Sequence, residues 1–515
     1  MRKFFKQKLA KQKAIDEQVA EMNSAFQDYV IAGSFEKDIE KVKELFQDVD
    51  ILRLKYVNNN YNKNLKYCLI YSDGLVNNLI INENIVKPLM LSKVEAKGAD
   101  LADTVMNEII QINEMKKTVL VQDIVEAITY GDTVVFINEA SEAIILNTKG
   151  FEVRAIAEPD NEKNLSGPRE GFTEALLLNL SMVRRKVRTP ELKMKFITLG
   201  RRTQTKACVC YMDGIVNEEI LAELYQRLDQ IDIDAVLDVN YITELIRDAR
   251  WSPFRTTGYT ERPDVVVGKI MEGRIAIFLD GTPDVLTVPY LFVENFQSGE
   301  DYYLNFFYAS FSRIIRMLGF FLTITVPGFY IATVAFHQEM MPLQLFLNIA
   351  AERQSVPLPA AFEAFIMLIV FDILKETGIR MPSNVGQALS IVGAIVIGQA
   401  GVEAKLVASP MIIVVGLTGI TSLLVPKLNA PTIYIRLAFL FLASAFGFYG
   451  FLLAFSALFI HLLNIRSLGI TQFSPAGRLK YQENKDTLFR APWWQMVLRP
   501  SFAANKVRMG GNRNE

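Results

Sequence analysis

The sequence Val385-Gly-Gln-Ala-Leu-Ser-Ile-Val-Gly-Ala-Ile-Val-Ile-Gly-Gln-Ala-Gly401 contains no charged residue and lies inside an apolar region that covers residues 313–466. Two further apolar stretches, 407–425 and 431–465, follow it. About 20 consecutive apolar residues are enough to cross a bilayer as a helix. A soluble core does not need several such stretches in succession, so we expect this region to be an all-α polytopic membrane domain.

The residues on either side of this region have a different composition. The chain has 515 residues and a net charge of −1. Its N-terminus is basic but lacks the apolar run of a secretory signal, which places the preceding half in the cytoplasm. The three cysteines, Cys68, Cys208 and Cys210, are too few for a disulfide framework and are expected to be buried thiols.

An internal repeat organises the first half of the chain. The sequence Leu65-Lys-Tyr-Cys-Leu-Ile-Tyr-Ser-Asp-Gly-Leu-Val-Asn77 returns as Thr205-Lys-Ala-Cys-Val-Cys-Tyr-Met-Asp-Gly-Ile-Val-Asn217. Downstream, Gly131-Asp-Thr-Val-Val-Phe-Ile-Asn138 returns as Gly273-Arg-Ile-Ala-Ile-Phe-Leu-Asp280. Two matched blocks in the same order indicate a duplication. Strands mixed with helices then predict an α/β cytosolic region of two similar subdomains.

Each copy predicts a leading helix, two strands and an Asp-Gly turn, followed by helices and a second strand pair. The predicted helices are 35–47 and 172–187, and the first strand pairs are 52–57 with 66–71 and 194–198 with 207–212. The complete division of the chain is a basic segment 1–34, subdomain 35–148, linker 149–171, subdomain 172–290, interfacial connector 291–316, transmembrane domain 317–465 and basic cytoplasmic tail 466–515.

No catalytic constellation is recognisable in the sequence. It has no Gly-rich phosphate loop, nucleophile elbow or HExxH motif. The two histidines, His337 and His461, lie near the ends of apolar segments. We therefore predict a protein that is not an enzyme and that uses no cofactor or metal.

A basic run in the second copy has two interpretations. A solvated face is the simpler one, and contact with anionic lipid or with the other subdomain is the alternative. Nucleic acid binding is disfavoured because the cations are not interleaved with aromatic residues. The candidate contact residues are Arg184, Arg185, Lys186, Arg201 and Arg202.

Charges at the ends of the apolar region predict its orientation. Arg313 and Arg316 precede the first segment, and a basic tail follows the last. Because positive flanks mark the cytoplasmic side, both termini are expected there and the number of crossings is four or six. The stretch 431–465 is too long for one crossing and either tilts or breaks near Gly447-Phe-Tyr-Gly450. The aromatic stretch 302–316 is predicted to lie as a helix at the membrane interface.

Three residues are candidates for gating or kinking. Pro327 and Gly328 lie in the middle of the first apolar segment, where proline is expected to bend a helix. Glu363 lies in another apolar stretch, and a carboxylate is costly inside a bilayer. Glu363 is therefore expected near an interface, or facing protein or water.

Small and polar residues follow one another at helical spacing in the quoted segment. Such a face either lets helices approach closely or borders a water-filled path for ions. The residues on this candidate pore or packing face are Ser383, Gly386, Ser390, Gly393, Ala394, Gly398, Gln399 and Glu403.

Several motifs together resemble the A subunits of GerA-type spore germinant receptors. The matching stretches are 167–174, 260–264, 273–283, 379–382, 391–401 and 490–494. The resemblance implies a multi-pass protein of the inner spore membrane in a spore-forming bacterium. It also implies two partners, a transporter-like B subunit and a lipoprotein C subunit.

The same resemblance implies that copies of the chain assemble into a ring that acts as a nutrient-gated cation channel, which releases monovalent ions early in germination. A sporulation-stage paralogue that amplifies ion release is the close alternative. A secondary transporter and a non-conducting scaffold are two further possibilities, and a transporter predicts inverted repeats in the membrane region.

Overall fold

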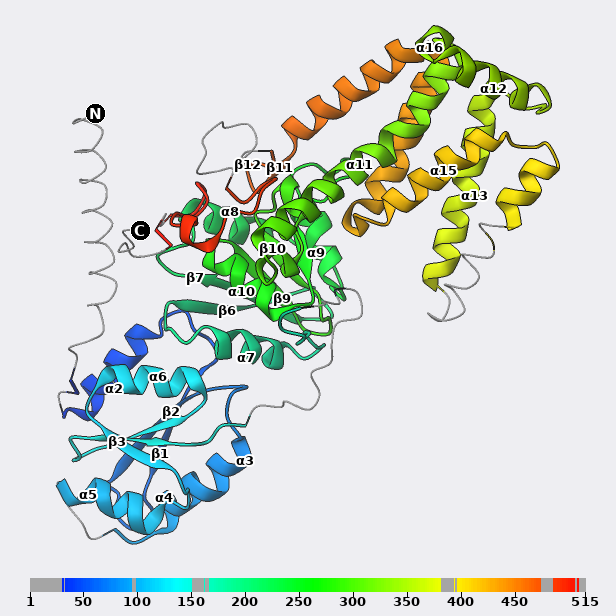
Figure 1. Cartoon of the computed structure of the whole chain (residues 1–515). Coiled ribbons are helices and arrows are strands. Elements are labelled where there is room, and N and C mark those ends of the chain that lie inside the picture. The colour runs from blue at the N-terminus through cyan, green and yellow to red at the C-terminus, as the bar shows by residue number, and fades with distance from the viewer. Residues whose placement is uncertain are drawn as a thin grey trace, which may run out of the picture.

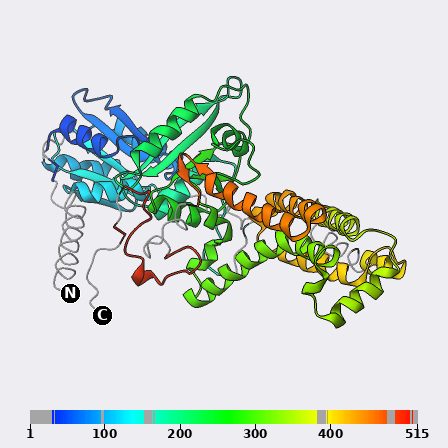
Figure 2. The same cartoon turned by 90° about the horizontal axis from the view of Figure 1, so that it is seen from above.

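The computed structural model describes residues 30–31, 33–94, 99–150, 162, 166–380, 393, 396–473, 485–504 and 507–508. An α/β part forms one end of the molecule, and a group of long helices extends away from it (Figures 1 and 2). The predicted order, α/β first and helices afterwards, is confirmed.

The first subdomain is a five-stranded sheet with helices on both faces. Its strands have the order β1-β2-β4-β5-β3 and pair antiparallel. The strands are β1 Leu52–Asn58, β2 Lys66–Ser72, β3 Met115–Thr118, β4 Thr133–Ile137 and β5 Ala143–Leu146. The helices are α2 Phe35–Leu45, α3 Asn78–Ile80, η1 Ile81–Val86, α4 Lys87–Leu91, α5 Ala99–Thr104, η2 Val105–Ile109 and α6 Val121–Tyr130.

The second subdomain repeats this sheet, with the order β6-β7-β9-β10-β8. Its strands are β6 Leu192–Leu199, β7 Thr205–Met212, β8 Gly258–Thr260, β9 Ile275–Leu279 and β10 Val285–Val288. Its helices are α7 Leu176–Lys186, α8 Glu218–Asp229, α9 Val239–Ile246 and α10 Pro263–Met271. The leading helix α7 begins four residues later than predicted.

The two sheets agree in register as well as in order. Cys68 pairs with Phe136 in the first sheet, and Cys208 pairs with Phe278 in the second. All three cysteines are buried, as predicted. At the turn after each of these strands, Gly74 and Gly214 have φ of +79° and +70°, values that favour glycine.

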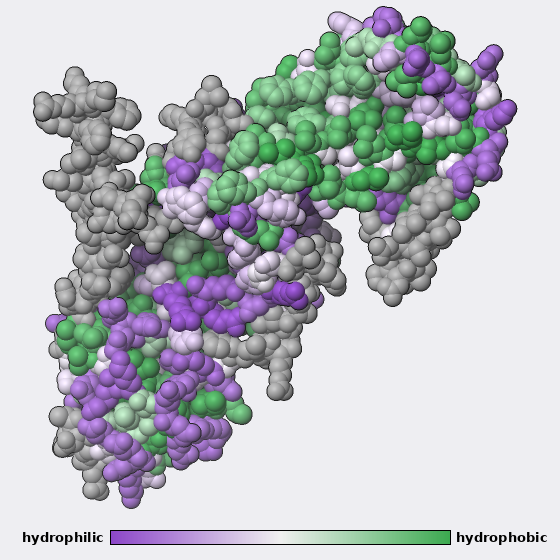
Figure 3. All heavy atoms as spheres, viewed as in Figure 1, coloured by the Kyte–Doolittle hydropathy of each residue, from purple (hydrophilic) through white to green (hydrophobic). Residues whose placement is uncertain are grey.

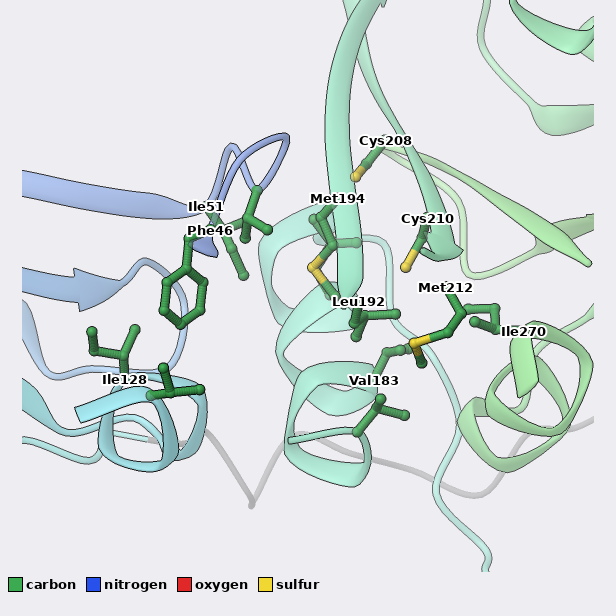
Figure 4. Packing of buried hydrophobic residues seen from close by; sticks show 14 of the residues in the cluster. Phe46, Ile51, Ile128, Val183, Leu192, Met194, Cys208, Cys210, Met212 and Ile270 are labelled. Atoms are coloured by element: carbon green, nitrogen blue, oxygen red, sulfur yellow. The ribbon is translucent and has the colours of Figure 1, made fainter. Parts of the chain in front are cut away.

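One apolar core is shared by both subdomains. Because side chains alternate along a strand, β2 directs Cys68 and Ile70 to one face, and β7 directs Cys208 and Cys210 to the equivalent face. Both faces belong to a single buried cluster that also contains residues of α2, α6, α7 and α10. Figure 4 shows side chains of the two subdomains meeting in it.

Backbone hydrogen bonds also join the subdomains. The amide of Asp50 donates to the carbonyl of Met194 at 2.9 Å, and the amide of Met194 donates to the carbonyl of Asp48 at 3.1 Å. Separating the subdomains would break these bonds and expose the shared core. We therefore treat the α/β part as one mechanical unit.

The helical part begins with α11, Phe306–Ala335. Residues 306–316 of the stretch predicted as an interfacial helix form the continuous start of α11. The other helices are η3 Phe292–Phe296, η4 Gly299–Tyr302, η5 Gln338–Met340, α12 Leu343–Gln354, α13 Ala360–Arg380, α15 Ser409–Ser422, η6 Pro426–Leu428, α16 Asn429–Asn464 and η7 Trp493–Gln495, and the strands β11 Arg466–Ser467 and β12 Ile470–Thr471 follow α16.

Two helical stretches among the described residues are long and apolar enough to cross a membrane: Phe306–Ala335 and Pro426–Asn464. Apolar side chains cover much of the outer surface of the helical part, and polar residues gather at its far tip and on the α/β part (Figure 3).

Helix α16 breaks at Gly447 and folds back on itself. Gly447 has φ of 59° and ψ of −137°, outside the helical region. The rings of Phe439 and Phe451 lie 5.5 Å apart, whereas 12 residues of a straight helix would separate them by about 18 Å. Of the two alternatives for this stretch, tilt or break, the structure shows the break.

Candidate functional site

A buried cluster of charges lies where the α/β part meets α11. Arg313 of α11 is 1% exposed. Its Nε donates to Oδ2 of Asp301 at 2.7 Å, and its Nη1 donates to Oδ1 of Asp486 at 2.7 Å. Arg316, one helical turn further along α11, donates from Nη2 to Oδ1 of Asp301 at 2.6 Å. We call these four residues the charged junction.

Three different parts of the chain supply the charged junction. Asn305 caps α11 by accepting the amide of Phe307 at 3.0 Å, and the i, i+3 spacing of the two arginines sets them on one face of the helix. Asp301 lies in η4, and its carboxylate also accepts a hydrogen bond from the amide of Ser298 at 3.2 Å. Asp486 comes from the C-terminal tail. The junction therefore connects η4, which follows the second subdomain, with the first long helix and the tail.

Burial and charge act in opposite directions on Asp301. Burial alone would raise the pKa of its carboxyl, but the hydrogen bonds and positive charges of Arg316 and Arg313 outweigh burial, and the pKa of Asp301 is lowered. Asp301 is therefore ionised in the folded protein. Removing one partner of a buried ion pair leaves an uncompensated charge, which is strongly destabilising.

Aromatic rings enclose the junction on the tail side. The hydroxyl of Tyr302 donates to Oδ2 of Asp486 at 2.6 Å. The guanidinium groups of Arg313 and Arg490 lie 5.5 and 5.9 Å from the centre of the Tyr302 ring, and the ring of Trp493 lies 5.9 Å from it. The predicted tail motif 490–494 thus contacts the base of α11.

A second buried ion cluster lies beside the junction. Glu294 is 3% exposed and pairs with Lys269 and Arg274. Burial opposes its ionisation, but Arg274 and Lys269 lower the pKa of Glu294. Further along the tail, Nη2 of Arg508 donates to Glu272 at 2.8 Å. The tail is therefore held at several points along the second subdomain.

Among the described residues, two ion pairs within the helical part have a buried member. Glu363 is 1% exposed. Its carboxylate lies 3.3 Å from Nη1 of Arg353 in α12 and accepts the amide of Ala408 at 2.6 Å. Of the environments considered for Glu363, the structure shows one that faces protein. Further along α13, Asp372 pairs with Arg436 of α16.

Pro327 and Gly328 are buried inside α11. A Cβ on Gly328 would lie 3.2 Å from the carbonyl oxygen of Phe439 in α16, so this glycine permits close helix contact.

Only part of the predicted pore face can be placed. Ser383, Gly386, Ser390 and Ala394 lie outside the described residues. Residues 396–403 are helical, with Gly398 buried and both Gln399 and Glu403 exposed. A Cβ on Gly398 would lie 3.8 Å from Ile412, and one on Gly393 would lie 2.9 Å from Leu374. These two glycines therefore face neighbouring helices.

The predicted basic surface needs one correction. Arg184 is 0% exposed, and its guanidinium donates to the carbonyls of Thr189 and Leu192 at 2.8 Å each. It therefore cannot contact lipid. Burial lowers the pKa of Arg184 to about 10. Its role is to donate hydrogen bonds to the backbone carbonyls that follow α7.

The other four cations of the predicted basic surface lie beside acids. Arg185 and Lys186 both pair with Glu170, and Arg201 pairs with Asp232. Arg202 lies 3.8 Å from Asp234. Three acids therefore lie beside these four cations and offset most of their positive charge.

A cavity of about 550 Å³ lies between the two subdomains. Its lining carries two acids and two bases along with apolar groups: Asp50, Arg53, Ala175, Leu176, Leu177, Phe196, Lys206 and Asp280. Both acids already accept hydrogen bonds from backbone amides. Asp50 accepts one from Phe196 at 2.6 Å, and Asp280 accepts one from Leu176 at 3.1 Å. Among the described residues, no group of three His, Cys, Asp or Glu is placed to hold a metal ion.

Sequence reasoning missed Asp301 and Asp486 as members of a site. Arg313 and Arg316 were noted only as flanking charges, and nothing in the polar tail distinguishes Asp486 from its neighbours. The pair of Asp372 with Arg436 was also missed, but it had a signal, because Arg436 is a lone charge within an apolar stretch and such residues usually face a partner inside the protein.

Known proteins are similar to this chain over most of its length. Residues 39–502 match the family model described as Bacillus/Clostridium GerA spore germination protein. Spore germination protein KA of Bacillus subtilis is 40% identical over 486 residues, which cover 93% of this chain and 89% of that protein. Spore germination protein GerLA of Bacillus cereus is 34% identical over 85% of this chain and 89% of its own length.

Two further matches are a membrane protein and the solved structure of a single domain. A Bacillus subtilis protein named uncharacterized membrane protein YfkQ is 37% identical over 87% of each chain. Among solved structures, the N-terminal domain of the A subunit of the Bacillus megaterium spore germinant receptor GerK3 is 28% identical and covers 51% of this chain and 98% of its own, with a TM-score of 0.42.

Proposed function

The chain belongs to the Bacillus/Clostridium GerA spore germination protein family, and from that premise we propose that it is the A subunit of a nutrient germinant receptor in the inner spore membrane. The observation that carries this proposal is the full-length similarity to spore germination proteins, combined with apolar helices that follow the α/β half. As the resemblance of its motifs implies, its partners are a transporter-like B subunit and a lipoprotein C subunit.

We infer six membrane crossings: α11, α13, the apolar sequence 385–401, α15 and the two limbs of α16. At the far end, the turn at Gly447 lies against Phe336, because a Cβ there would come within 2.9 Å of that ring. At the near end, Nζ of Lys375 in α13 donates to Asn429 at 2.9 Å, where α16 begins. Alternating ends of this kind return both termini to one side, which we take as cytoplasmic.

We propose that copies of the chain assemble around an ion path. Many large apolar side chains on the helices are exposed in the single chain, including Phe441 at 71% and Ile413 at 73%. Lipid or neighbouring copies can cover such side chains. The exposed polar residues Gln399 and Glu403 remain the candidates for a water-facing surface.

Signal transfer from the α/β part to the helices is assigned to the charged junction. Since the two subdomains share one core, a partner that binds either of them moves the α/β part as a unit. Asp301, in η4 between that unit and α11, forms a buried ion pair with Arg313 of α11. A shift of Asp301 would therefore displace the start of α11 and, through its contacts, α16. A partner can drive such a shift only by its different affinity for the two states.

Current recording across a bilayer tests this function. The purified chain is reconstituted alone and with its B and C subunits, and nutrients are added. Nutrient-dependent cation current that requires the chain supports the proposal. Saturable substrate uptake without unitary current favours a secondary transporter, and no current in any combination favours a scaffold.

A further inference from the structure

Trp251 is the most exposed large apolar residue of the described chain, at 99%. It lies in the loop between α9 and β8, far from the charged junction along the sequence. A tryptophan that contacts nothing in its own chain is unusual, because its large ring gains most from burial. The position of this loop indicates what covers the ring.

The loop is fixed to the end of the last long helix. Oγ of Ser252 lies 2.9 Å from Nε2 of His461 in α16. Phe254, which is 1% exposed, has its ring centre 6.0 Å from that of His461. Phe254 belongs to a buried cluster with Phe320 of α11 and Leu462 of α16. The loop is therefore packed firmly against α11 and α16.

These contacts determine the depth of Trp251. His461 lies three residues before Asn464, where α16 ends, and three residues of helix span about 4.5 Å. Trp251 directly precedes Ser252, so its Cα lies about 3.8 Å from that of Ser252. Trp251 is thus placed close to the end of the apolar helix. Tryptophan is enriched at this level in membrane proteins.

The surroundings of Trp251 are amphipathic. Leu237, Tyr241 and Leu245, in and just before α9, are 62%, 43% and 43% exposed. Two exposed arginines, Arg250 and Arg255, flank the tryptophan. Exposed apolar side chains next to cations suit a layer of anionic headgroups.

Arg255 acts on the nearby carboxyl of Asp284, and its guanidinium lies 4.8 Å from the centre of the Tyr259 ring. Asp248 is already paired with Arg227 at 2.6 Å. Glu244 is exposed, and it accepts a hydrogen bond from Nδ2 of Asn240 at 3.4 Å.

We propose that the Trp251 loop anchors the second subdomain in the headgroup layer of the bilayer. The ring of Trp251 inserts at the boundary between headgroups and acyl chains, and Arg250 and Arg255 meet lipid phosphates. The anchor holds the α/β part at a fixed height while α11 passes beside it. This inference rests on the proposed membrane placement of the helices.

Depth-dependent quenching of tryptophan fluorescence tests the anchor. The full chain carrying Trp493→Phe and Trp494→Phe retains Trp251 as its only tryptophan. It is reconstituted in nanodiscs of phosphatidylcholine and phosphatidylglycerol that carry either a headgroup spin label or mid-chain bromines, and iodide reports exposure to water. We expect the headgroup label to quench Trp251 at least twofold more than the bromines, with little quenching by iodide.

Control chains add Trp251→Phe and place a single tryptophan on the exposed helix surface, by Phe441→Trp or Ile413→Trp. We expect mid-chain bromines to quench these controls most strongly. If neither control is quenched by lipid, the membrane placement itself fails and the anchor with it. If the controls are quenched but iodide alone quenches Trp251, the anchor is overturned. Protection of Trp251 from both iodide and lipid would indicate a protein partner and would also overturn it.

Discussion

Arg313 and Asp486 are 173 residues apart in the chain, yet Nη1 of Arg313 lies 2.7 Å from Oδ1 of Asp486. The same arginine also pairs with Asp301 at 2.7 Å. The C-terminal tail therefore returns from the last long helix to the base of the first one. It then continues along the second subdomain, where Ala503 enters the core shared by the two subdomains. Because these parts share buried ion pairs, a movement of one of them changes the position of the others.

The two acids of the junction should differ in their effect on stability. The side chain of Asp301 is 1% exposed and pairs with two arginines, whereas that of Asp486 is 27% exposed. Asp301→Asn should therefore cost about 3–5 kcal/mol, and Asp486→Asn about 1–3 kcal/mol because solvent screens it. Asp232→Asn, in an exposed pair with Arg201, is the matched control and should change little. Thermal unfolding of the purified chain measures all three, and equal effects for the three variants would contradict the assignment.

Ionisation of the Asp284 carboxyl should lower the free energy of unfolding as the pH rises. Burial, together with Glu261, Asp238 and Glu162, raises the pKa of Asp284 from 3.8 to about 6, against the influence of Arg255. The folded state then binds more protons than the unfolded state between these values, so its free energy of unfolding falls across that window. The full shift corresponds to about 3 kcal/mol, which solvent screening reduces to about 1–2 kcal/mol.

The variant Asp284→Asn removes this ionisation. It should unfold at a higher temperature than the natural chain at pH 7, and the difference should shrink as the pH falls toward 4. Unfolding temperatures recorded from pH 4 to pH 7.5 supply the test. A difference that does not vary with pH would show that the carboxyl titrates normally.

The reversal in α16 depends on a glycine. Gly447 adopts φ of 59° and ψ of −137°, and a Cβ there would lie 2.9 Å from Phe336. Backbone strain of this kind costs about 1–3 kcal/mol for other residues. Gly447→Ala should therefore lower the yield of monodisperse protein in size-exclusion chromatography and its unfolding temperature. Gly416→Ala, at a helical glycine with open space around it, should be neutral, and equal behaviour of the two variants would argue against the turn.

Side-chain size at Gly398 should control ion release. A Cβ there would meet Ile412 at 3.8 Å, an ordinary contact distance, so Gly398→Ala should release potassium on nutrient addition as the natural chain does. Gly398→Leu must push α15 away and should slow release at least tenfold. Potassium electrodes in spore suspensions follow both variants. Normal release from Gly398→Leu spores would show that this helix lies away from the ion path.

Local sequence signals predicted the α/β half well. The repeat predicted which strands correspond, and β1, β2, β6 and β7 lie where they were expected. The strands β3 and β8 were missed, because each is short and carries no extended apolar run. Pro263 begins α10, a position where its fixed φ and missing amide hydrogen cost nothing.

Contacts between distant residues could not be predicted in this way. The basic run around Arg184 suggested a surface, yet the guanidinium turns inward because the chain after α7 leaves carbonyls that need a donor. In the same way, Arg313 and Arg316 suggested the edge of a membrane, whereas their partners come from η4 and the tail. Pairing of this kind depends on tertiary proximity, which composition and periodicity do not encode.

The most direct test of signal transfer through the charged junction is potassium release from spores in which this chain is the only member of its family. Spores carrying Asp301→Asn are compared with spores carrying Asp232→Asn, at equal amounts of receptor in the membrane fraction. We predict that nutrient-triggered release is lost or slowed at least tenfold in the first strain and normal in the second. Normal release from Asp301→Asn spores that contain the usual amount of receptor would contradict the account.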